Sequence, residues 1–450
     1  MSLNWLKVSV GAMKGGQFWV SLVMGLITCF WSKLGSWLAF NVDGVEMSSQ
    51  FMSFDFLSVL MAMLTSFIML LSLAGEVDNY DVDKGWAEFG SLMVCLLIVG
   101  SLFFFSSRVF LLLFYFESSM VPVLCLVLGW GLQPERLQAA TYMVVYTICG
   151  SLPLLMALCS VVDTLGTDVM GVLMLISSKG LLFPENVLMM MLISPMLVKI
   201  PVYFVHSWLP KAHVEAPISG SMILAGVMLK MGLYGLCRML SVFGFLSSGL
   251  STVLMSVCII GGLICSLTCF CIYDVKMIIA YSSITHMGLS VAGVVSGLPV
   301  GWSGGLCMGL AHGVCSPALF MLSGLVYSIC GSRSVLLCSG VLSGVPVVSG
   351  LLFFYCCLNL GAPPSLSFYG EILIYCSVMG VLSYCGTIIL GMSSLVAGSY
   401  SVALYSKVNH GMGSSFLYSD GSFSVRWVYT VFLGLPVLVF GSLYLDLFLN

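Results

Sequence analysis

The stretch that decides the fold runs from Val198 to Gly235 and reads VKIPVYFVHSWLPKAHVEAPISGSMILAGVMLKMGLYG. It places three lysines, two histidines, one glutamate and three prolines within sequence that is otherwise largely apolar. The apolar runs on both sides are long enough to cross a bilayer, which takes about 20 residues in a helix. Because an ionisable side chain at the bilayer centre costs about 2.5–3.5 kcal/mol, such residues usually mark a path for ions or protons.

The composition excludes a water-soluble globule. Of the 450 residues, 60% are hydrophobic and 7% are charged, and the mean hydropathy is +1.12, whereas soluble domains contain about 25% charged residues. The apolar runs match membrane helices rather than the shorter alternating strands of a barrel. We therefore expect an all-α polytopic membrane protein in contact with lipids. The net charge of −3 predicts no nucleic-acid partner.

Apolar runs predict roughly thirteen or fourteen transmembrane helices. The expected spans cover 18–31, 51–75, 89–105, 108–131, 139–163, 187–208, 217–240, two within 249–297, then 302–330, 335–360, a broken run ending near 384, 386–406 and 427–447. For residues 169–183, the sequence leaves open whether the chain crosses the membrane or lies in its interface. The residues 76–88 form the most acidic loop, interpreted as a solvated connector.

Lys199 and Glu117 lie within two of these expected spans. Pro201 follows Lys199 almost at once, and proline interrupts the hydrogen bonds of a helix. A break inside the membrane is tolerated only where protein or water covers it, so we expect Lys199 to face a polar interior. Glu117 lies midway along its own span, and Pro122 can kink that helix five residues later.

Glu371 repeats this design about 170 residues after Lys199, because Pro363-Pro364 breaks its apolar run. Corresponding broken helices in two halves of a transporter point to its ion site. Burial in a low dielectric favours the neutral form of each ionisable group, while a nearby opposite charge favours the charged form. A row of such groups joined by water would therefore be a proton relay.

Each half also contains companion polar groups. Lys230 accompanies the first break, and His286 and His312 accompany the second. Lys276 can be interpreted either as part of the path or as an interfacial residue that extends its ammonium to the membrane surface.

The loop expected around residue 211 supplies further candidates with a plainer interpretation. Lys211 and Glu215 are expected at the membrane interface. For His206 and His213, structural hydrogen bonds are favoured over proton transfer.

No cofactor or metal site is predicted in this chain. The 18 cysteines are scattered through apolar spans without a C-x-x-C pair, and a buried cysteine behaves as a small hydrophobe. Neither a P-loop nor a dinucleotide-binding fingerprint occurs. If the chain belongs to a redox enzyme, the redox centres must lie in other subunits.

The central stretch closely resembles the signature of the chain 4 family of NADH–ubiquinone oxidoreductase, respiratory complex I. Four further segments match that family in the same order: FESSMVPVLCLVLGWGLQPERLQAATY, DVKMIIAYSSITHMGL, GLAHGVCSPALF and PPSLSFYGE. The resemblance covers residues 51–447, and the parent group includes multisubunit sodium/proton antiporters.

This resemblance implies an antiporter-like fold with two inverted five-helix repeats and broken helices near Lys199 and Glu371. The implied divisions are N-terminal transmembrane helices in 1–88, a first repeat in 89–240, a second repeat in 241–406, and a C-terminal loop with the last transmembrane helix in 407–450.

The resemblance also implies a proton path through Glu117, Lys199, Lys230, Lys276, His286, His312 and Glu371. Glu117 and Lys199 would act as a pair, and Lys230 would pass protons towards the centre. The two histidines and Lys276 would lie on a connecting hydrophilic axis, and Glu371 would lie in the outer half-channel.

The function implied is proton translocation coupled to NADH oxidation and ubiquinone reduction in partner subunits. Those subunits would bind NADH, FMN, iron–sulfur clusters and ubiquinone, and neighbouring antiporter-like subunits would be the direct partners. The compact length and the absence of a clear targeting segment favour a mitochondrially encoded chain in the inner membrane. Two alternatives remain: a sodium/proton antiporter subunit without redox coupling, and a membrane scaffold.

Overall fold

The computed structural model describes residues 47–48, 51–76, 86–131, 133–175, 184–244, 246–411 and 425–444. The span expected at 18–31 and most of the acidic connector at 76–88 lie outside the described residues, so the total number of transmembrane helices stays a prediction.

Helices make up nearly all of the first half of the described chain. Its elements are β1 (Met47–Ser48), β2 (Ser53–Phe54), α3 (Phe56–Glu76), α4 (Trp86–Phe105), α5 (Val109–Ser118), α6 (Met120–Trp130), α7 (Arg136–Leu165), α8 (Met170–Leu175), α9 (Glu185–Lys199), α10 (Trp208–Glu215), α11 (Ile218–Ile223), the π-helix η1 (Leu224–Met228) and α12 (Leu229–Phe243). The two short strands pair in antiparallel fashion just before α3.

The second half continues the same helical pattern. Its elements are α13 (Ser248–Thr268), the 3₁₀ turn η2 (Cys269–Cys271), α14 (Val275–Val295), α15 (Pro299–Cys330), α16 (Val341–Gly344), α17 (Pro346–Leu360), α18 (Leu366–Asn409), α19 (Val425–Phe440) and the 3₁₀ turn η3 (Gly441–Tyr444). The two spans expected within 249–297, with a turn near Asp274, are confirmed as α13 and α14.

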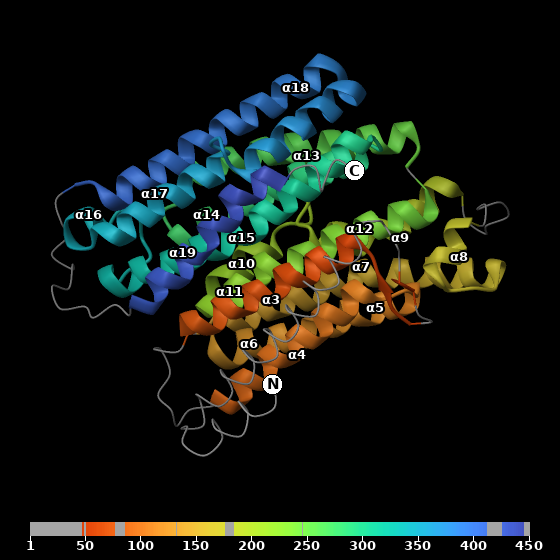
Figure 1. Cartoon of the computed structure of the whole chain (residues 1–450), viewed down its shortest axis with the longest axis horizontal. Coiled ribbons are helices and arrows are strands. Elements are labelled where there is room, and N and C mark those ends of the chain that lie inside the picture. The colour runs from red at the N-terminus through yellow and green to blue at the C-terminus, as the bar shows by residue number, and fades with distance from the viewer. Residues whose placement is uncertain are drawn as a thin grey trace.

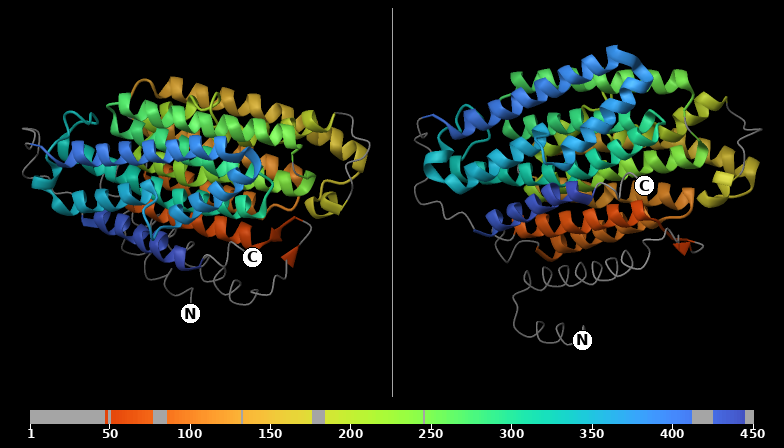
Figure 2. Two further views of the ribbon diagram at one scale, coloured as in Figure 1. Left: turned by 90° about the horizontal axis from the view of Figure 1, so that it is seen from above. Right: turned by 45° about the horizontal axis from the view of Figure 1, so that its top comes forward.

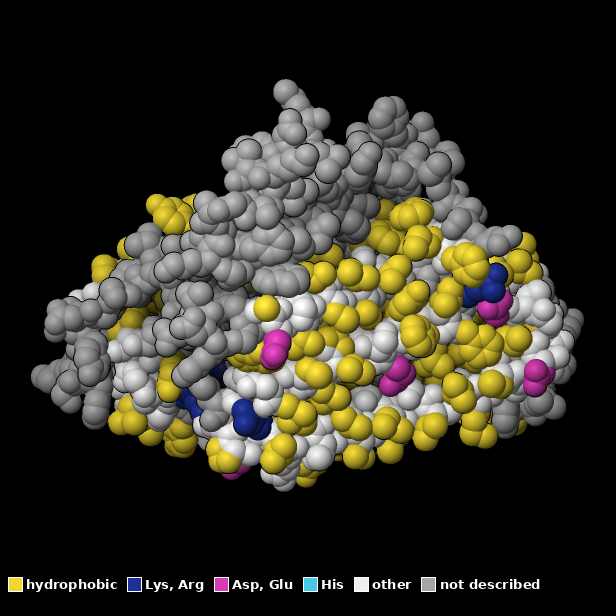
Figure 3. Space-filling model, turned by 90° about the horizontal axis from the view of Figure 1, so that it is seen from below, with side chains coloured by type: hydrophobic (Ala, Val, Ile, Leu, Met, Phe, Trp, Pro, Cys, Tyr) yellow, Lys and Arg dark blue, Asp and Glu magenta, His cyan; other side chains and the backbone are white. Residues whose placement is uncertain are grey.

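The helices lie side by side along the longest axis of the molecule (Figure 1). The run from α11 to α12, together with α14 and α15, is buried almost completely by the rest of the chain. Outer helices such as α7 and α18 expose apolar side chains instead, and apolar groups dominate the face shown in Figure 3. Nine helices in the described residues are long and apolar enough to cross a membrane, which makes this a multi-pass membrane protein.

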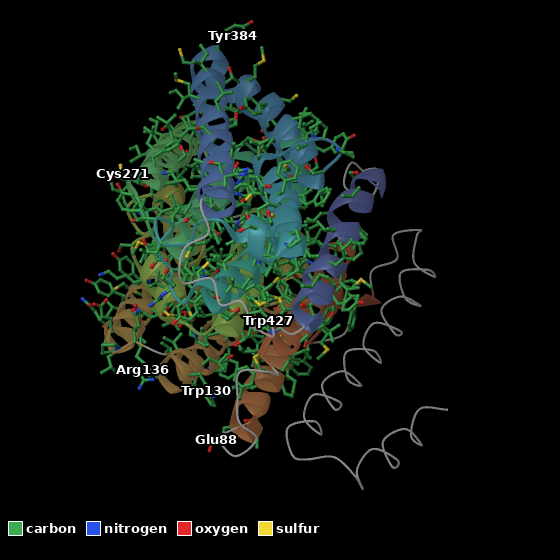
Figure 4. All side chains as sticks on the ribbon, turned by 90° about the vertical axis from the view of Figure 1, so that its left-hand side faces the viewer. Glu88, Trp130, Arg136, Cys271, Tyr384 and Trp427 are labelled. Carbon is green, nitrogen blue, oxygen red and sulfur yellow. The ribbon has the colours of Figure 1, made fainter. Side chains whose placement is uncertain are left out.

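The two halves of the chain occupy opposite ends of an end-on view. Figure 4 places Tyr384, on α18, at one extreme, and Glu88, Trp130 and Arg136, on α4, α6 and α7, at the other. Helix α19 returns to pack beside α3, as the views in Figure 2 also show. The central helices α12, α14 and α15 therefore lie where the two halves meet.

The first predicted helix break is present. Helix α9 ends at Lys199 and α10 begins at Trp208, with Pro201 in the irregular segment between them. The loop expected after this break is wrong, because Trp208–Glu215 is a helix and Glu215 is 6% exposed. Proline is tolerated in the first turn of a helix, so Pro210 does not prevent α10 from forming.

The second predicted break is also present. Helix α17 ends at Leu360, and α18 begins at Leu366 after Pro363-Pro364. Gly361 has a φ of +79°, a left-handed conformation that glycine adopts without strain. Ser383 interrupts α18 with a φ of 59°, and this kink separates the expected run that ends near 384 from the span expected at 386–406.

Three expected boundaries need correction. The span expected at 335–360 forms a long helix only from Pro346, because Gly340 takes a left-handed conformation and Pro346 starts α17. The span expected from residue 51 begins at Phe56, after the β1–β2 pair. Of the undecided stretch 169–183, the structure describes α8 with six helical residues, too few to cross a membrane.

Candidate proton path

Lys199 ends α9 inside the protein, with 1% of its surface exposed. Its Nζ donates to the Phe116 carbonyl at 2.5 Å and to the Ser119 hydroxyl at 3.1 Å, and lies 3.4 Å from the centre of the Phe116 ring. These groups come from the junction of α5 and α6, three residues before Pro122. Pro122 lacks the N–H that would bond the carbonyl four residues earlier, so the helix is interrupted next to the groups that hold the ammonium.

Glu117 comes from the same junction and interacts electrostatically with Lys199. Within the described residues, however, no ion pair shorter than 4.0 Å joins the two side chains. The Oε1 atom of Glu117 is buried without a hydrogen-bond partner there. The predicted pair is therefore brought together, but with separate contacts, so its charges can be rearranged without breaking a direct salt bridge.

Lys230 lies at the centre of the molecule, fully buried at the start of α12. Its Nζ is 2.8 Å from the Ala225 carbonyl, in the π-helical turn η1, and 2.8 Å from Nδ1 of His312, on α15. A π-helical turn alters the regular backbone spacing and often occurs at functional positions. Tertiary packing thus joins one predicted group of the first half directly to one of the second half.

His286, on α14, faces His312 with 5.9 Å between the ring centres. Neither ring nitrogen of His286 has a hydrogen-bond partner among the described residues. A small cavity touches both histidines, and Asn359 and Ser367 supply further polar groups to its lining. Polar lining of this kind allows a buried water molecule to complete the hydrogen bonds.

Glu371 lies on α18, one helical turn after Ser367, so the two side chains share a face of that helix. At the second break, a Cβ atom on Gly361 would lie 3.1 Å from Oε2 of Glu371. Among the described residues, no ion pair within 4.0 Å includes this carboxylate. The cavity beside the histidines therefore leads towards an acid that has no direct cationic neighbour there.

Lys276 lies apart from this central group. It precedes His286 by ten residues on α14, which corresponds to about 15 Å along the helix. Its Nζ donates to the Ala216 carbonyl at 3.2 Å, just beyond the end of α10. With 8% of its surface exposed, Lys276 is buried in the chain, and both interpretations of its role stay predictions.

The hydrogen bond expected for His213 is not made to any protein group among the described residues. This residue of α10 is 0% exposed, and neither ring nitrogen has a hydrogen-bond partner among the described residues. Its ring stacks on Phe320, of α15, with 4.5 Å between the ring centres and 6° between the planes. The sequence alone did not indicate this burial, because only the packing of α10 against its neighbours encloses the ring.

A second missed cluster closes one end of this region. The amide of Gln133, in its hydrogen-bonding orientation, donates to Glu215 Oε1 at 2.8 Å and accepts from Arg333. Arg333 also donates to the Val214 carbonyl at 3.1 Å. The cluster ties the segment before α7 and the end of α10 to the turn after α15. Glu215 was the feature of the sequence that could have indicated this cluster. A carboxylate near a broken helix needs hydrogen-bond or charged partners when it is buried.

No group of three or more histidine, cysteine or acidic side chains that could hold a metal ion occurs in the described residues. The absence of a cofactor from this chain remains a prediction. All cysteines in that part of the chain are free thiols, and about half of them are buried among apolar groups.

Comparisons with known proteins identify the family and the fold. The family described as NADH:quinone oxidoreductase/Mrp antiporter, TM matches residues 106–397. NADH-ubiquinone oxidoreductase chain 4 of Ceratitis capitata is 39% identical over 387 residues, which cover 86% of this chain and 85% of that protein. The chain 4 protein of Lumbricus terrestris is 36% identical over 376 residues, which cover 82% of each.

A solved structure shares the same fold. A chain of "Respiratory complex I from Thermus thermophilus with bound NADH" aligns with a TM-score of 0.83 at 21% identity, over 94% of this chain and 90% of that chain. The fold is thus that of the antiporter-like membrane subunits. Within that class, the chain belongs to the family of NADH–ubiquinone oxidoreductase chain 4, and the resemblance found in the sequence is confirmed.

Proposed function

We propose that this chain translocates protons across the membrane as a core subunit of NADH–ubiquinone oxidoreductase, while partner subunits oxidise NADH and reduce ubiquinone. The observation that carries the proposal is the 2.8 Å contact between Lys230 and His312, which joins ionisable groups of the two halves at the buried centre. Buried ionisable residues in a membrane protein usually mark the route of an ion or proton.

In the first half, Glu117 and Lys199 form a switch. The Phe116 carbonyl and ring and the Ser119 hydroxyl stabilise Lys199 as an ammonium. A negative Glu117 adds to this stabilisation, whereas a protonated Glu117 removes it and favours release of the lysine proton. Arrival of a proton on the glutamate would thereby send another proton onwards from the lysine.

At the centre, Lys230 and His312 share a proton path. A protonated Lys230 donates to Nδ1 of His312, so the neutral imidazole carries its own proton on Nε2. Transfer of the lysine proton to Nδ1 and loss of the Nε2 proton move one charge across the ring. Water in the cavity beside Asn359 and Ser367 would accept that proton.

In the second half, Glu371 receives the proton. Ser367 lies between the cavity and Glu371 along one face of α18, at a spacing of one turn. The second helix break brings Gly361 against the carboxylate, and this lack of a side chain leaves room for Glu371. A partly buried acid without an ion-pair partner can hold a proton without charge until a path to the surface opens.

The two breaks support a division into a first repeat at 89–240 and a second repeat at 241–406, preceded by N-terminal helices and followed by the segment 407–450. The names of the relatives support membership of complex I in the mitochondrial inner membrane, beside other antiporter-like subunits. NADH, FMN, iron–sulfur clusters and ubiquinone would then be bound by partner subunits.

Sodium/proton antiport without redox coupling is the alternative, since the family description covers both kinds of protein. Purification in mild detergent separates the two. Co-purification with flavin and iron–sulfur subunits is expected. Recovery of the chain with antiporter subunits alone, free of redox centres, would contradict the redox-coupled proposal.

The direct test is Glu117→Gln in membranes that contain the assembled complex. We expect normal assembly and a parallel loss of proton pumping and NADH–ubiquinone activity, because the amide cannot hold a proton for transfer. If pumping and turnover are both unchanged, the path through Glu117 and Lys199 is wrong, and a scaffold role is favoured instead.

A further inference from the structure

We propose that His213 carries protons along a side branch that connects the Lys230–His312 centre with one end of the helix bundle, between α10 and α14. The branch rests on the proposed function, because it takes its protons from the same centre. It would give the central groups an exchange route that bypasses both Lys199 and Glu371.

The position of His213 along the helices defines the branch. Helix α15 carries His312 and, eight residues later, the Phe320 ring on which His213 stacks. Eight residues correspond to about 12 Å of helix rise, which places His213 beyond direct contact with the centre. Ser316 lies halfway, and its hydroxyl is 3.4 Å from Nδ1 of His312. The route therefore begins with a hydroxyl step towards His213.

The environment of His213 calls for water. The side chain is 0% exposed, both ring nitrogens lack partners among the described residues, and buried polar atoms are nearly always hydrogen-bonded to protein or ordered water. The charges of Lys276 and Lys230 both act on the ring. Lys276 contacts the carbonyl of Ala216, three residues after His213, and the Lys230 contact lies at His312, eight residues before Phe320. His213 therefore lies between these two buried cations along the bundle, where water molecules can bridge its ring to either side.

Lys276 continues the branch from His213 towards the end of the bundle. Its Nζ contacts the Ala216 carbonyl at 3.2 Å, and Ala216 adjoins Glu215, at the end of α10. Gln133 links Glu215 to Arg333, in the turn that follows α15. Polar groups consequently extend from the central cavity to the loops at this end, along the contact of α10 with α14.

The chemistry of each transfer balances at the imidazole. Neutral His213 accepts a proton on one ring nitrogen and releases the proton of the other, so one N–H bond forms while another breaks. The nearly parallel stack on Phe320 holds the plane of the ring, so its two nitrogens remain at the ring edge, free of the aromatic contact. No oxidant, reductant or further reactant is required.

Two substitutions separate proton transfer from packing and hydrogen bonding. His213→Phe keeps an aromatic ring that can stack on Phe320, and His213→Gln keeps polar atoms for hydrogen bonds. Neither side chain can relay protons, so we expect both variants to assemble and to slow coupled proton pumping by about tenfold or more. If either variant assembles and pumps at the normal rate, the branch is overturned.

His206 provides the matched control. It lies in the irregular segment just before α10 and also stacks on an aromatic ring, with 5.1 Å between its ring centre and that of Tyr203. His206→Phe and His206→Gln should leave pumping within about twofold of normal, since the His206 ring is only partly buried and packs on Tyr203 and Tyr281. An equal loss in both histidine positions would contradict a specific role for His213.

Glu117→Gln, measured in parallel, keeps this inference distinct from the proposed function. Loss of pumping in Glu117→Gln with normal pumping in a His213 variant would remove the branch and leave the proposed function standing. Normal pumping in both would remove the proposed function. Should one His213 variant fail to assemble, the rate of the other decides.

Discussion

Both helix breaks are short irregular segments that contain proline, but the ionisable side chains at the two breaks differ. At the first, Lys199 ends α9 among a carbonyl, a hydroxyl and an aromatic ring, and Glu117 acts on it from the α5–α6 junction. At the second, Glu371 lies against the bare backbone of Gly361, and no ion pair within 4.0 Å includes it among the described residues. One break holds an acid and a base, whereas the other holds an acid alone.

This difference separates two ways of handling a buried proton. A pair can exchange charge internally, because protonation of one member changes the stability of charge on the other. A lone acid depends on water and on the opening of a path, since among the described residues no ion-pair partner within 4.0 Å drives the proton of Glu371 away. The halves should therefore respond differently when charge or space is altered at each break.

The largest effect is expected from a double-mutant cycle on Glu117 and Lys199. Glu117→Gln and Lys199→Met each leave one member of the switch without its partner, and each should lower NADH-driven pumping by about 10²-fold. Because both act in one step, the double variant should pump no worse than the worse single variant. Losses that multiply would mean that the two residues act independently of each other.

Glu371→Gln should have the next largest effect. Among the described residues no ion-pair partner of Glu371 would be left unpaired, so assembly should be normal while pumping falls by about tenfold or more. A combined variant with Lys199→Met should show multiplied losses if the two breaks act independently. Losses that fail to multiply would contradict the distinction between the breaks.

The shared centre can be probed through Gly313. A Cβ atom there would lie 2.8 Å from Leu64 Cδ2 and 3.1 Å from Lys230 Cε, so Gly313→Ala must displace the lysine or its packing. We expect pumping to fall by about tenfold, because small displacements of reacting groups are costly. Gly129→Ala is the control, since a Cβ there meets nothing within 4 Å. Equal activity in both variants would show that Lys230 tolerates displacement.

The smallest effect is expected at Gly361. An added Cβ would be strained at a φ of +79°, costing about 1–2 kcal/mol, and would press on the Glu371 carboxylate at 3.1 Å. Gly331→Ala is the matched control, with a φ of +68° and nothing within 4 Å of the new Cβ. Thermal unfolding should shift similarly in both variants, whereas pumping should fall only in Gly361→Ala. A similar decrease in both would assign the effect to backbone strain.

Much of the fold could be predicted because the membrane restricts what a chain can do. Apolar runs of sufficient length must become helices, and prolines beside Lys199 and Glu371 must interrupt them. The predicted helix boundaries were wrong where a proline interrupts an apolar run. Pro346, for example, begins α17 well inside the span expected at 335–360. The short helix α10 was missed because its charged residues suggest a loop when the neighbouring helices are not known.

The sequence by itself therefore determined the membrane class, the family and the positions of most buried charges, since each depends on residue type and local order. Only the tertiary structure decided which groups meet. Lys230 and His312 are 82 positions apart in the sequence and yet 2.8 Å apart in space. His213 is identified only by the packing that buries it against Phe320. Contacts between helices depend on how their faces pack, and that information is not local in the chain.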